Sequence, residues 1–465
     1  MASHNKSDLR SLAEELRKIL GDQWVITQRE FMESYLKDET PDPIRPKPAE
    51  NLILVKPSST MEVTSVLKFA NVRRIPVFPV GGRTGLVGGA VPTESGIILS
   101  LERMKRIAVD RENLMAIAEA GATLGDLIRM AEDAGLFFPL HPGDEGAQIG
   151  GLIATNAGGV RAVKYGVMRN YVKGLEAVLP TGEVLSLGGR VLKDNTGYDL
   201  MQLIIGSEGT LCVITKAIIK LFPKSKFTVT LIVPFNARSD ALKSVPEILR
   251  SGVVPLAIEY VQIKEISETA KHLNENWPVQ KGPAQLIIIL DGISQEEVLL
   301  ACEEISRVCE SNNAIDVMLA ETSEEQNRIL RIRSNIYTAL KPNMIDILDV
   351  TVPPSNLKKL MDQVDEIAAK QGVYLPVYGH AGDGNLHVHI MKEGIKDLNM
   401  AEKIKKEVYK AAVDLGGVIT GEHGIGKLRI GNLNSVLNKK HLEIMKSIKR
   451  IFDPNNILNP HKVLP

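Results

Sequence analysis

Four histidines gather in two short, glycine-flanked segments of the chain. Residues 379–389 read GHAGDGNLHVH and residues 421–426 read GEHGIG, and the whole chain has only nine histidines. His380 and His387 flank Ala-Gly-Asp-Gly-Asn-Leu, a turn-forming stretch that allows the chain to double back and the two rings to converge. Neutral imidazoles with the carboxylate of Glu422 are a ligand set typical of catalytic zinc, and cobalt, manganese or iron can use it too. The pattern predicts a metal ion and a general base in one pocket.

Each of these histidines has a plainer explanation when it is taken singly. A lone histidine often only bonds a backbone carbonyl, but three glycine-flanked histidines with an adjacent Glu-His pair favour the metal site. His389 follows His387 by two residues and shares its face if the segment is a strand. The sequence leaves three roles open for His389: contact with the substrate, a fourth metal ligand, or packing.

Three glycine-rich loops occur in the first half of the chain. Residues 79–89 read PVGGRTGLVGG, residues 141–159 include HPGDEGAQIGG and IATNAGG, and residues 205–210 read IGSEGT. Such loops let backbone N–H groups turn toward a ligand, and pyrophosphate is their natural guest. The spacing fits neither a Rossmann fingerprint nor a P-loop. Tight surface turns would explain any one loop, but three in one domain favour a long, extended dinucleotide.

Composition narrows the function class. The formal net charge is zero, with 56 basic and 56 acidic residues, and aromatics make up only 4%, so nucleic-acid binding has little support. Three scattered cysteines without a CxxC predict neither a disulfide framework nor an iron–sulfur cluster held by this chain. We expect a reducing, cytoplasmic location, with no signal peptide and no transmembrane segment.

The first half of the chain reads as a mixed helix and sheet domain. Ser7-Asp8 predicts the start of a helix over 8–20, and a proline-rich linker follows at 41–48. Ser59-Thr-Met-Glu62 is a capping box for a helix to about residue 73. We expect strands at 76–80, 97–101, 114–118, 175–179 and 183–187, the last two joined by a turn at Thr181-Gly182.

After Pro223 two strand–helix–strand units follow one another. The predicted elements are strand 228–233, helix 238–250 and strand 256–261, then strand 285–290, helix 294–311 and strand 314–320. This repetition indicates a ferredoxin-like antiparallel sheet backed by helices. Beyond it we expect one long helix at 323–340, a strand at 346–352, and helices at 355–371 and 438–452.

Six ordered motifs together resemble the FAD-linked oxidases of the vanillyl-alcohol oxidase and p-cresol methylhydroxylase type. They are PVGGRTGLVGG, IGGLIATNAGG, KDNTGYDL, IGSEGTL, GHAGDGNLHVH with GEHGIG, and the closing NP-HK. The histidine motifs are similar to the D-2-hydroxyacid dehydrogenase branch, which includes the glycolate oxidase FAD subunit, D-lactate dehydrogenases and D-2-hydroxyglutarate dehydrogenase. The resemblance covers the chain from about residue 45 to residue 465.

This resemblance implies an α+β protein: a two-subdomain FAD-binding domain of the p-cresol methylhydroxylase type, and a ferredoxin-like antiparallel-sheet substrate cap with helices. The expected parts are a helical lead-in and linker at 1–46, an FAD-binding domain at 47–224, a substrate and metal cap at 225–435, and a C-terminal segment at 436–465 that returns to the FAD domain.

The residues implied to hold FAD lie in the glycine loops. The pyrophosphate would be wrapped by Gly81, Gly82, Arg83, Thr84 and Gly85. The flavin and ribityl chain would be lined by Pro142, Gly143, Gly150, Gly151, Thr155, Asn156 and Gly158. The adenosine end would lie near Glu208, Gly209 and Ile214, and the flavin near Asn459. Some relatives attach FAD to a histidine of the first loop, but this loop has none, so FAD is expected to be non-covalent.

The resemblance also assigns roles at the histidine segments. His380, His387 and Glu422 would bind a divalent metal, zinc first, with manganese, iron or cobalt as alternatives. His423 would be the base that takes the substrate hydroxyl proton while hydride passes to flavin N5. Arg333 would grip the substrate carboxylate in a bidentate clamp; the alternative for Arg333 is a solvated helix face.

The implied activity is oxidation of a small D-2-hydroxyacid to the 2-oxoacid. Relatives of the hydroxyglutarate type carry a lysine just before their D-[LV]-[ST]-[LV]-P strand, and the corresponding stretch here, Ile347-Leu348-Asp349, has no lysine. D-lactate or glycolate is therefore favoured over D-2-hydroxyglutarate. Electrons would pass to a quinone, an electron-transfer flavoprotein or an iron–sulfur subunit. Peripheral association with a membrane through that acceptor stays open. A homodimer also stays open.

Three other classes remain as alternatives. A metal-dependent hydrolase would use the same ligands but would bind no flavin. A non-catalytic flavin subunit could dispense with the metal ligands, all of which are present. The alkylglycerone-phosphate synthase relatives carry out non-redox flavin chemistry on a lipid, and the chain shows no obvious membrane-binding segment.

Overall fold

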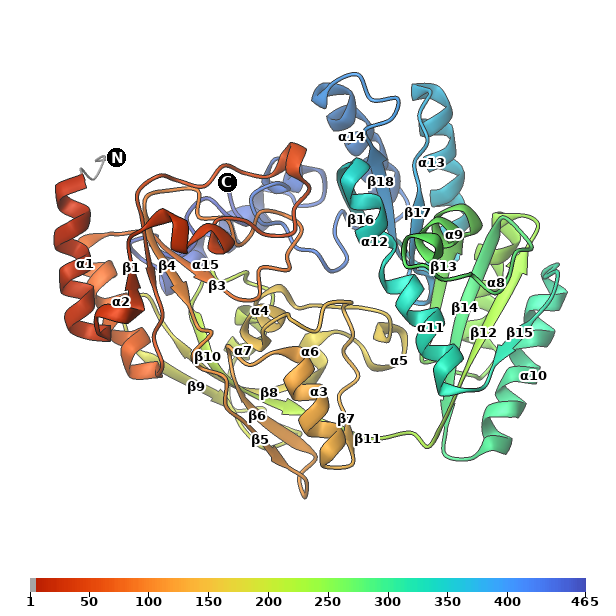
Figure 1. Cartoon of the computed structure of the whole chain (residues 1–465), viewed down its shortest axis with the longest axis horizontal. Helices are drawn as coiled ribbons and strands as arrows, with labels where there is room; N and C mark the ends of the chain where they lie inside the picture. The colour runs from red at the N-terminus through yellow and green to blue at the C-terminus, as the bar shows by residue number, and fades with distance from the viewer. Residues whose placement is uncertain (1–5) are drawn as a thin grey trace. The chain divides into compact units, whose positions relative to one another are not determined.

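The computed structural model describes residues 6–465, with side chains from Leu9 onward. The helix cap predicted at Ser7 and Asp8 lies outside the residues whose side chains are described. The chain divides into two compact units (Figure 1). The first, here called the split unit, comprises residues up to 157, 167–224 and 422–465; the second, the middle unit, comprises 158–166 and 225–421. In this division residues 422–435, which we expected in the cap, fall in the split unit. Gly158, which we expected beside the flavin, falls in the middle unit.

The split unit contains two main sheets. The four-stranded sheet has the order β1-β2-β4-β3, in which β4 is parallel to both neighbours. Its strands are β1 Val25–Ile26, β2 Leu52–Val55, β3 Val77–Val80 and β4 Gly96–Ser100. The five-stranded sheet is antiparallel with the order β5-β6-β10-β8-β9. Its strands are β5 Ile107–Asp110, β6 Met115–Glu119, β8 Val172–Val178, β9 Val184–Gly188 and β10 Val213–Lys220, and a separate pair joins β7 Leu136–Phe137 to β11 Phe222–Pro223.

Helices of the split unit begin where the sequence supplies caps. The Ser59 side chain accepts a hydrogen bond from Glu62 N at the start of α2, as the capping box predicts. Thr123 does the same for α3. The helices of this unit are α1 Lys6–Leu20, α2 Thr60–Arg73, α3 Leu124–Asp133, α4 Ile149–Thr155, α6 Met168–Tyr171, α7 Leu200–Ile204 and α15 Lys439–Phe452.

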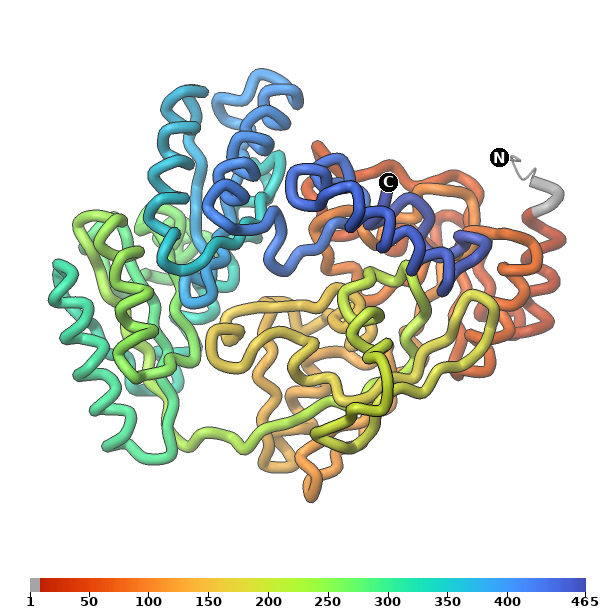
Figure 2. Tube along the Cα trace, turned by 180° about the vertical axis from the view of Figure 1, so that it is seen from behind, coloured from red at the N-terminus to blue at the C-terminus, as the bar shows by residue number. Residues whose placement is uncertain are grey.

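The C-terminal segment belongs to the split unit through direct pairing. Figure 2 shows it running beside the N-terminal part of the trace. Leu458 forms a parallel bridge with Val77, and Asn459 N donates to Val77 O at 2.9 Å. Residues far apart in sequence therefore complete one sheet edge.

The middle unit is built on one seven-stranded sheet. Its order is β15-β12-β14-β13-β17-β18-β16. The first four strands in that order are the two predicted strand–helix–strand units, arranged as in a ferredoxin-like sheet. The strands are β12 Phe227–Phe235, β13 Ala257–Gln262, β14 Ala284–Gly292, β15 Met318–Ala320, β16 Met344–Thr351, β17 Val377–His380 and β18 Asn385–Met391. The helices are α5 Ala162–Tyr165, α8 Arg238–Arg250, α9 Ile263–His272, α10 Gln295–Ser311, α11 Ser323–Ser334, α12 Ile336–Leu340, α13 Leu357–Gln371 and α14 Leu398–Asp414.

Two predicted elements of the middle unit differ from the structure. The helix expected over 323–340 is interrupted at Asn335, whose side-chain amide donates to Arg331 O at 2.8 Å. A short polar side chain that bonds the backbone in this way competes with helix continuation. The strand expected over 314–320 is interrupted: Ala314 makes an isolated bridge to Phe235, and regular pairing with β12 begins only at β15.

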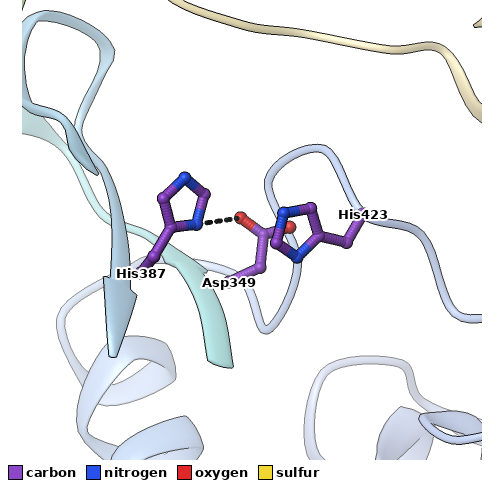
Figure 3. Close-up of side chains that lie close together, drawn as sticks. All are labelled: Asp349, His387 and His423. Atoms are coloured by element: carbon purple, nitrogen blue, oxygen red, sulfur yellow. Dashed lines mark ion pairs between the residues drawn. The ribbon is translucent and has the colours of Figure 1, made fainter. Parts of the chain in front are cut away.

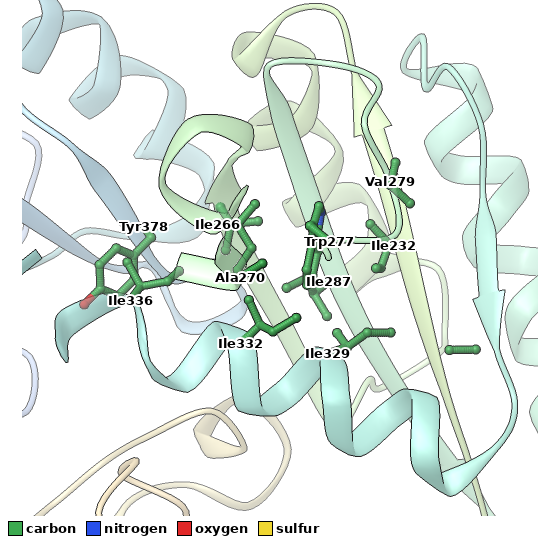
Figure 4. Close-up of a cluster of buried hydrophobic side chains, with 12 residues drawn as sticks. Ile232, Ile266, Ala270, Trp277, Val279, Ile287, Ile329, Ile332, Ile336 and Tyr378 are labelled. Carbon is green, nitrogen blue, oxygen red and sulfur yellow. The ribbon is translucent and has the colours of Figure 1, made fainter. Parts of the chain in front are cut away.

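A buried apolar cluster fixes α11 against the sheet (Figure 4). Ile329 and Ile332 of α11 are completely or almost completely buried, as is Ile336 at the start of α12. They pack in one cluster with Ile232 and Ile287 of the sheet. Burial of each such side chain contributes about 1.5–3 kcal/mol, which holds α11 and its last turn in place.

Across the described residues, no helix combines the length and apolar character needed to cross a bilayer.

Candidate active site

Two strands of the middle unit bring the predicted metal-binding histidines together. His380 ends β17 and His387 lies in β18, which pairs antiparallel with β17 after the short turn Ala381–Asp383. Gly384 closes that turn with φ of +82°, and a Cβ there would lie 1.9 Å from Val352 O. Only glycine fits such a position. The two imidazole rings meet edge to face, with centroids 5.4 Å apart.

Glu259 of β13 orients the first of these histidines. The His380 Nδ1 atom lies 2.7 Å from Glu259 Oε1, and the Glu259 side chain has no exposed surface. Burial acts to raise the pKa of Glu259, but the charges of Arg333 and His380 outweigh it and hold that pKa below its ordinary value. With Nδ1 used by a carboxylate, Nε2 is the nitrogen that His380 offers to a metal, the arrangement found for many metal-binding histidines.

The same carboxylate holds Arg333. Arg333 Nη2 lies 2.5 Å from Glu259 Oε2, and its guanidinium stacks 4.7 Å from the ring centre of Tyr378. The residue is only 5% exposed, which excludes the solvated helix face. Its Nε atom is buried and has no hydrogen-bond partner among the described residues. A buried N–H of this kind is suited to a ligand carboxylate.

His389 lies inside the sheet packing. It is completely buried, and its ring stacks on Tyr378 with centroids 4.9 Å apart and planes 24° apart. Tyr378 also meets His387 edge to face at 5.5 Å. Of the three roles left open by the sequence, this geometry favours packing.

Asp349 anchors the start of the GEHGIG segment and was missed by the sequence reasoning. It lies opposite His387 in the β16–β18 register. Its Oδ1 accepts a hydrogen bond from Asn385 Nδ2 at 2.7 Å, and its Oδ2 accepts from Thr420 Oγ1 at 2.9 Å and from Gly421 N at 2.8 Å. An acidic residue within the apolar strand sequence Ile-Leu-Asp-Val-Thr-Val was the available signal.

Glu422 and His423 directly follow Gly421 in the chain. They begin the last stretch of the split unit, whereas His380, His387 and Asp349 belong to the middle unit. Within the middle unit His387 Nδ1 lies 3.7 Å from Asp349 Oδ1, and Figure 3 draws this contact as a dashed line. Both oxygens of Asp349 already accept hydrogen bonds, so His380 and His387 suit a metal ion better than Asp349 does.

The glycine loops of the split unit approach one another closely. A Cβ on Gly81 would lie 3.5 Å from Gly151 Cα, and one on Gly82 would lie 2.7 Å from Gly146 O. A Cβ on Gly85, Gly143 or Gly151 would meet no atom of the described residues within 4 Å, its chain neighbours aside. These loops therefore touch at one side and are open at the other, as a cradle for an extended ligand requires.

Several other residues predicted to bind FAD carry unusual backbone conformations. The φ angle is positive at Arg83, Asn156, Glu208 and Asn459, between +41° and +62°. Non-glycine residues in this region cluster at ligand sites, since the surrounding structure must hold them there.

The remaining predicted FAD residues occupy varied positions. Thr155 ends α4 and its hydroxyl donates to Gly151 O at 3.0 Å. Gly150 packs against Ala120, Gly209 against Asn459, and Ile214 is buried in β10. Thr84 and Pro142 are half-buried in their loops. The Glu208 carboxylate accepts hydrogen bonds from Ile425 N and Gly426 N, both at 2.8 Å, a contact that the sequence did not indicate.

Comparisons with known proteins agree with this architecture. The family described as FAD linked oxidases, C-terminal domain, matches residues 224–463, and an FAD binding domain matches residues 52–188. The D-lactate dehydrogenase of Archaeoglobus fulgidus is 45% identical over 93% of this chain and 96% of the relative. The glycolate oxidase subunit GlcD of Bacillus subtilis is 37% identical over 88% of each chain.

The chain belongs to the FAD-linked oxidases. Its FAD-binding domain and its standing as an FAD-linked oxidoreductase, both expected from the sequence, are thereby confirmed. Solved structures confirm the fold: p-cresol methylhydroxylase with substrate bound superposes with a TM-score of 0.79 at 18% identity, covering 99% of this chain and 97% of that one. Alkyldihydroxyacetonephosphate synthase gives a TM-score of 0.75 at 20% identity, covering 97% and 86%. In this FAD-linked oxidase the open glycine cradle fits FAD, and the neighbouring imidazoles of His380 and His387 are of the kind that bind a divalent metal.

Proposed function

We propose that this protein oxidises a small D-2-hydroxyacid, D-lactate or glycolate, to the corresponding 2-oxoacid with non-covalent FAD and a divalent metal ion, zinc first. The observation that carries the proposal is the arrangement around Glu259, which joins His380 to Arg333 in one buried cluster. A metal-binding group and a carboxylate-binding group are thus held at fixed separation, as recognition of a 2-hydroxycarboxylate requires. The names of the relatives support the same substrate class.

In this proposal the protein's own residues divide the work. Arg333 binds the substrate carboxylate through its buried Nε atom, while its Nη2 atom stays with Glu259. His380, His387 and Glu422 hold the metal, and His423 takes the hydroxyl proton. When bound, FAD accepts the electron pair from C2 of the substrate, and the metal ion lowers the pKa of the hydroxyl group.

The preference for a small substrate is supported by the cations near β16. The stretch Ile347-Leu348-Asp349 of β16 lacks the lysine that hydroxyglutarate-type relatives carry. Nearby, Lys405 is already engaged by Asp346 at 3.7 Å and by Glu402 at 2.5 Å. A second substrate carboxylate would therefore have no ready partner there. D-2-hydroxyglutarate is the runner-up substrate, since a relative from Oryza sativa that is 36% identical over 89% of this chain bears the name probable D-2-hydroxyglutarate dehydrogenase.

Anaerobic flavin bleaching tests the proposal. Purified protein with its bound flavin is mixed with D-lactate, glycolate, D-2-hydroxyglutarate or L-lactate, and the flavin absorbance is followed. We expect D-lactate or glycolate to bleach the flavin fastest, with L-lactate as the inactive mirror-image control. Chelator treatment should abolish bleaching, and zinc, manganese, cobalt or iron should be compared for its recovery.

The outcomes separate the alternatives. A colourless protein that hydrolyses esters in a metal-dependent way would indicate the hydrolase. A yellow protein that no 2-hydroxyacid bleaches, with or without added metal, would refute the proposed activity and indicate a non-catalytic flavin subunit. The electron acceptor is proposed to be a quinone, an electron-transfer flavoprotein or an iron–sulfur subunit, and reoxidation of the bleached enzyme by each identifies it.

A further inference from the structure

Glu208 connects a predicted FAD loop with the loop that carries the predicted base. It follows α7 in the sequence Ile-Gly-Ser-Glu-Gly-Thr, whereas Ile425 and Gly426 lie two and three residues after His423. One carboxylate oxygen accepts from Ile425 N and the other from Gly426 N, each at 2.8 Å. Hydrogen bonds to an ionised carboxylate are the stronger class, and two on successive amides fix the direction of the peptide chain.

The GEHGIG loop is shaped to receive this carboxylate. A Cβ on Gly424 would lie 2.8 Å from Glu208 Oε1, and Gly424 has φ of +85°. A Cβ on Gly426 would lie 2.3 Å from Val87 O. Larger residues at either position would push the loop away from Glu208 or from the first glycine loop.

Glu208 is itself held firmly from both sides. Its backbone N donates to Ala154 O at 2.7 Å, and its carbonyl accepts from Asn459 Nδ2 at 2.8 Å. Lys462 lies in the same neighbourhood and donates to Gly89 O at 2.5 Å. Burial raises the pKa of Glu208 and lowers that of Lys462 to about 7, while the amides of Ile425 and Gly426 and the mutual attraction of the two side chains act in the opposite direction. The carboxylate therefore has a fixed position from which to hold the loop.

We propose that Glu208 is a positioning residue for His423. By fixing residues 424–426, its carboxylate sets where the His423 imidazole stands when it takes the substrate hydroxyl proton. This role rests on the function proposed above, and it differs from the contact with the adenosine end of FAD that the sequence suggested for Glu208. The prediction is that loss of the carboxylate slows proton removal and leaves FAD binding unchanged.

Three variants and one control test the role by rapid mixing with D-lactate. Glu208→Ala removes both acceptors, Glu208→Gln keeps one, and Gly424→Ala crowds the carboxylate from the other side. Glu119 also accepts a backbone amide, that of Arg106 at 2.9 Å, and Glu119→Gln is the matched control. Because a displacement of about 1 Å can cost about 100-fold in rate, we expect Glu208→Ala to lower the limiting rate of flavin reduction by about 10–100-fold. Glu208→Gln should lie between it and wild type.

Two further readouts distinguish positioning from a general structural defect. FAD stoichiometry and the dissociation constants of FAD and D-lactate should stay within about 2-fold of wild type. In a His423→Asn background, Glu208→Ala should cause little further loss, since residues that act as one unit are non-additive. Full additivity, or weakened FAD binding with an unchanged limiting rate, would overturn the role and support the adenosine contact.

Hydrogen exchange keeps the test independent of activity. The amides of residues 422–426 are followed by mass spectrometry in wild type, Glu208→Ala and Glu119→Gln. Faster exchange confined to this segment in Glu208→Ala supports the positioning role even if no 2-hydroxyacid bleaches wild-type flavin, in which case only the proposed substrate class fails. Unchanged exchange refutes it.

Discussion

Replacement of Glu259 by Gln probes the cluster on which the proposed substrate and metal sites both depend. The change keeps the size of the side chain and removes its charge, while Arg333 remains only 5% exposed. Breaking a buried ion pair costs about 3–5 kcal/mol, and the retained amide oxygen places Glu259→Gln near the lower value. At about 2–4 °C per kcal/mol for a unit of this size, the Tm should fall by about 6–12 °C. Metal affinity should fall about 10–100-fold, because His380 loses its orienting carboxylate.

The assay combines thermal unfolding with metal competition against a chelating dye. Glu265→Gln is the matched control, because Glu265 is also a buried carboxylate of the middle unit but accepts its hydrogen bond from Tyr374. Burial raises the pKa of Glu265, so loss of its charge should cost little, and metal affinity should not change. If Glu259→Gln binds metal within about 2-fold of wild type and keeps its Tm, the reasoning about this cluster is refuted.

The pH dependence of the Glu259 effect has a definite sign. The folded-state pKa of Glu259 lies below its ordinary value, so the folded protein binds fewer protons there than the unfolded chain. Its stabilisation is present above the unfolded pKa of about 4.3 and is lost as the pH falls through the folded value. The difference in stability between wild type and Glu259→Gln should therefore shrink in acid and stay constant near neutrality.

Three further predictions concern His389, Gly421 and Lys462. His389→Phe should keep the stack on Tyr378 and leave the rate of flavin reduction within about 3-fold of wild type. His389→Ala should lower the free energy of unfolding by about 2–4 kcal/mol in urea titrations. A large rate loss in His389→Phe would mean that the imidazole takes part in the reaction. Gly421→Ala would place a Cβ 2.3 Å from Thr351 Oγ1, so the rate of flavin reduction should fall by about 100-fold, and a wild-type rate would show that the loop tolerates the shift. Burial lowers the pKa of Lys462 to about 7 in the folded protein. Between that pH and about 10, the unfolded chain binds one proton more than the folded protein does. The free energy of unfolding should therefore rise with pH, by up to about 1.4 kcal/mol per pH unit. In Lys462→Met this rise should be absent from the Tm measured between pH 7 and 9. Parallel Tm profiles for wild type and the variant would contradict the lowered pKa of the buried Lys462 amine.

The sequence was sufficient for features that depend on local geometry. The turn between His380 and His387 was visible because two glycines interrupt a short polar stretch, and the glycine loops were visible for the same reason. The helix over 238–250 was predicted within its observed bounds, since apolar periodicity and flanking strands agree. The break at Asn335 was missed because neither proline nor glycine marks it.

The supporting carboxylates could not be predicted in this way. Glu259 lies 121 residues before His380, and its role depends on strand order in a seven-stranded sheet. Asp349 and Gly421 meet across 72 residues for the same reason. Each is a single polar residue whose partner is set by register, and register between distant strands is not encoded in local periodicity. The sequence therefore predicted candidate metal ligands and a candidate base, but not the residues that hold those side chains in place.

The division of the chain has a consequence for the order of events on the ribosome. Residues 422–465 are synthesised after the entire middle unit, yet Leu458 pairs with Val77 and Asn459 bonds the backbone of Glu208. The middle unit, whose sheet needs nothing beyond residue 421, can therefore fold while the split unit still lacks an edge. Cofactor capture is expected to come last, after translation has supplied the closing segment.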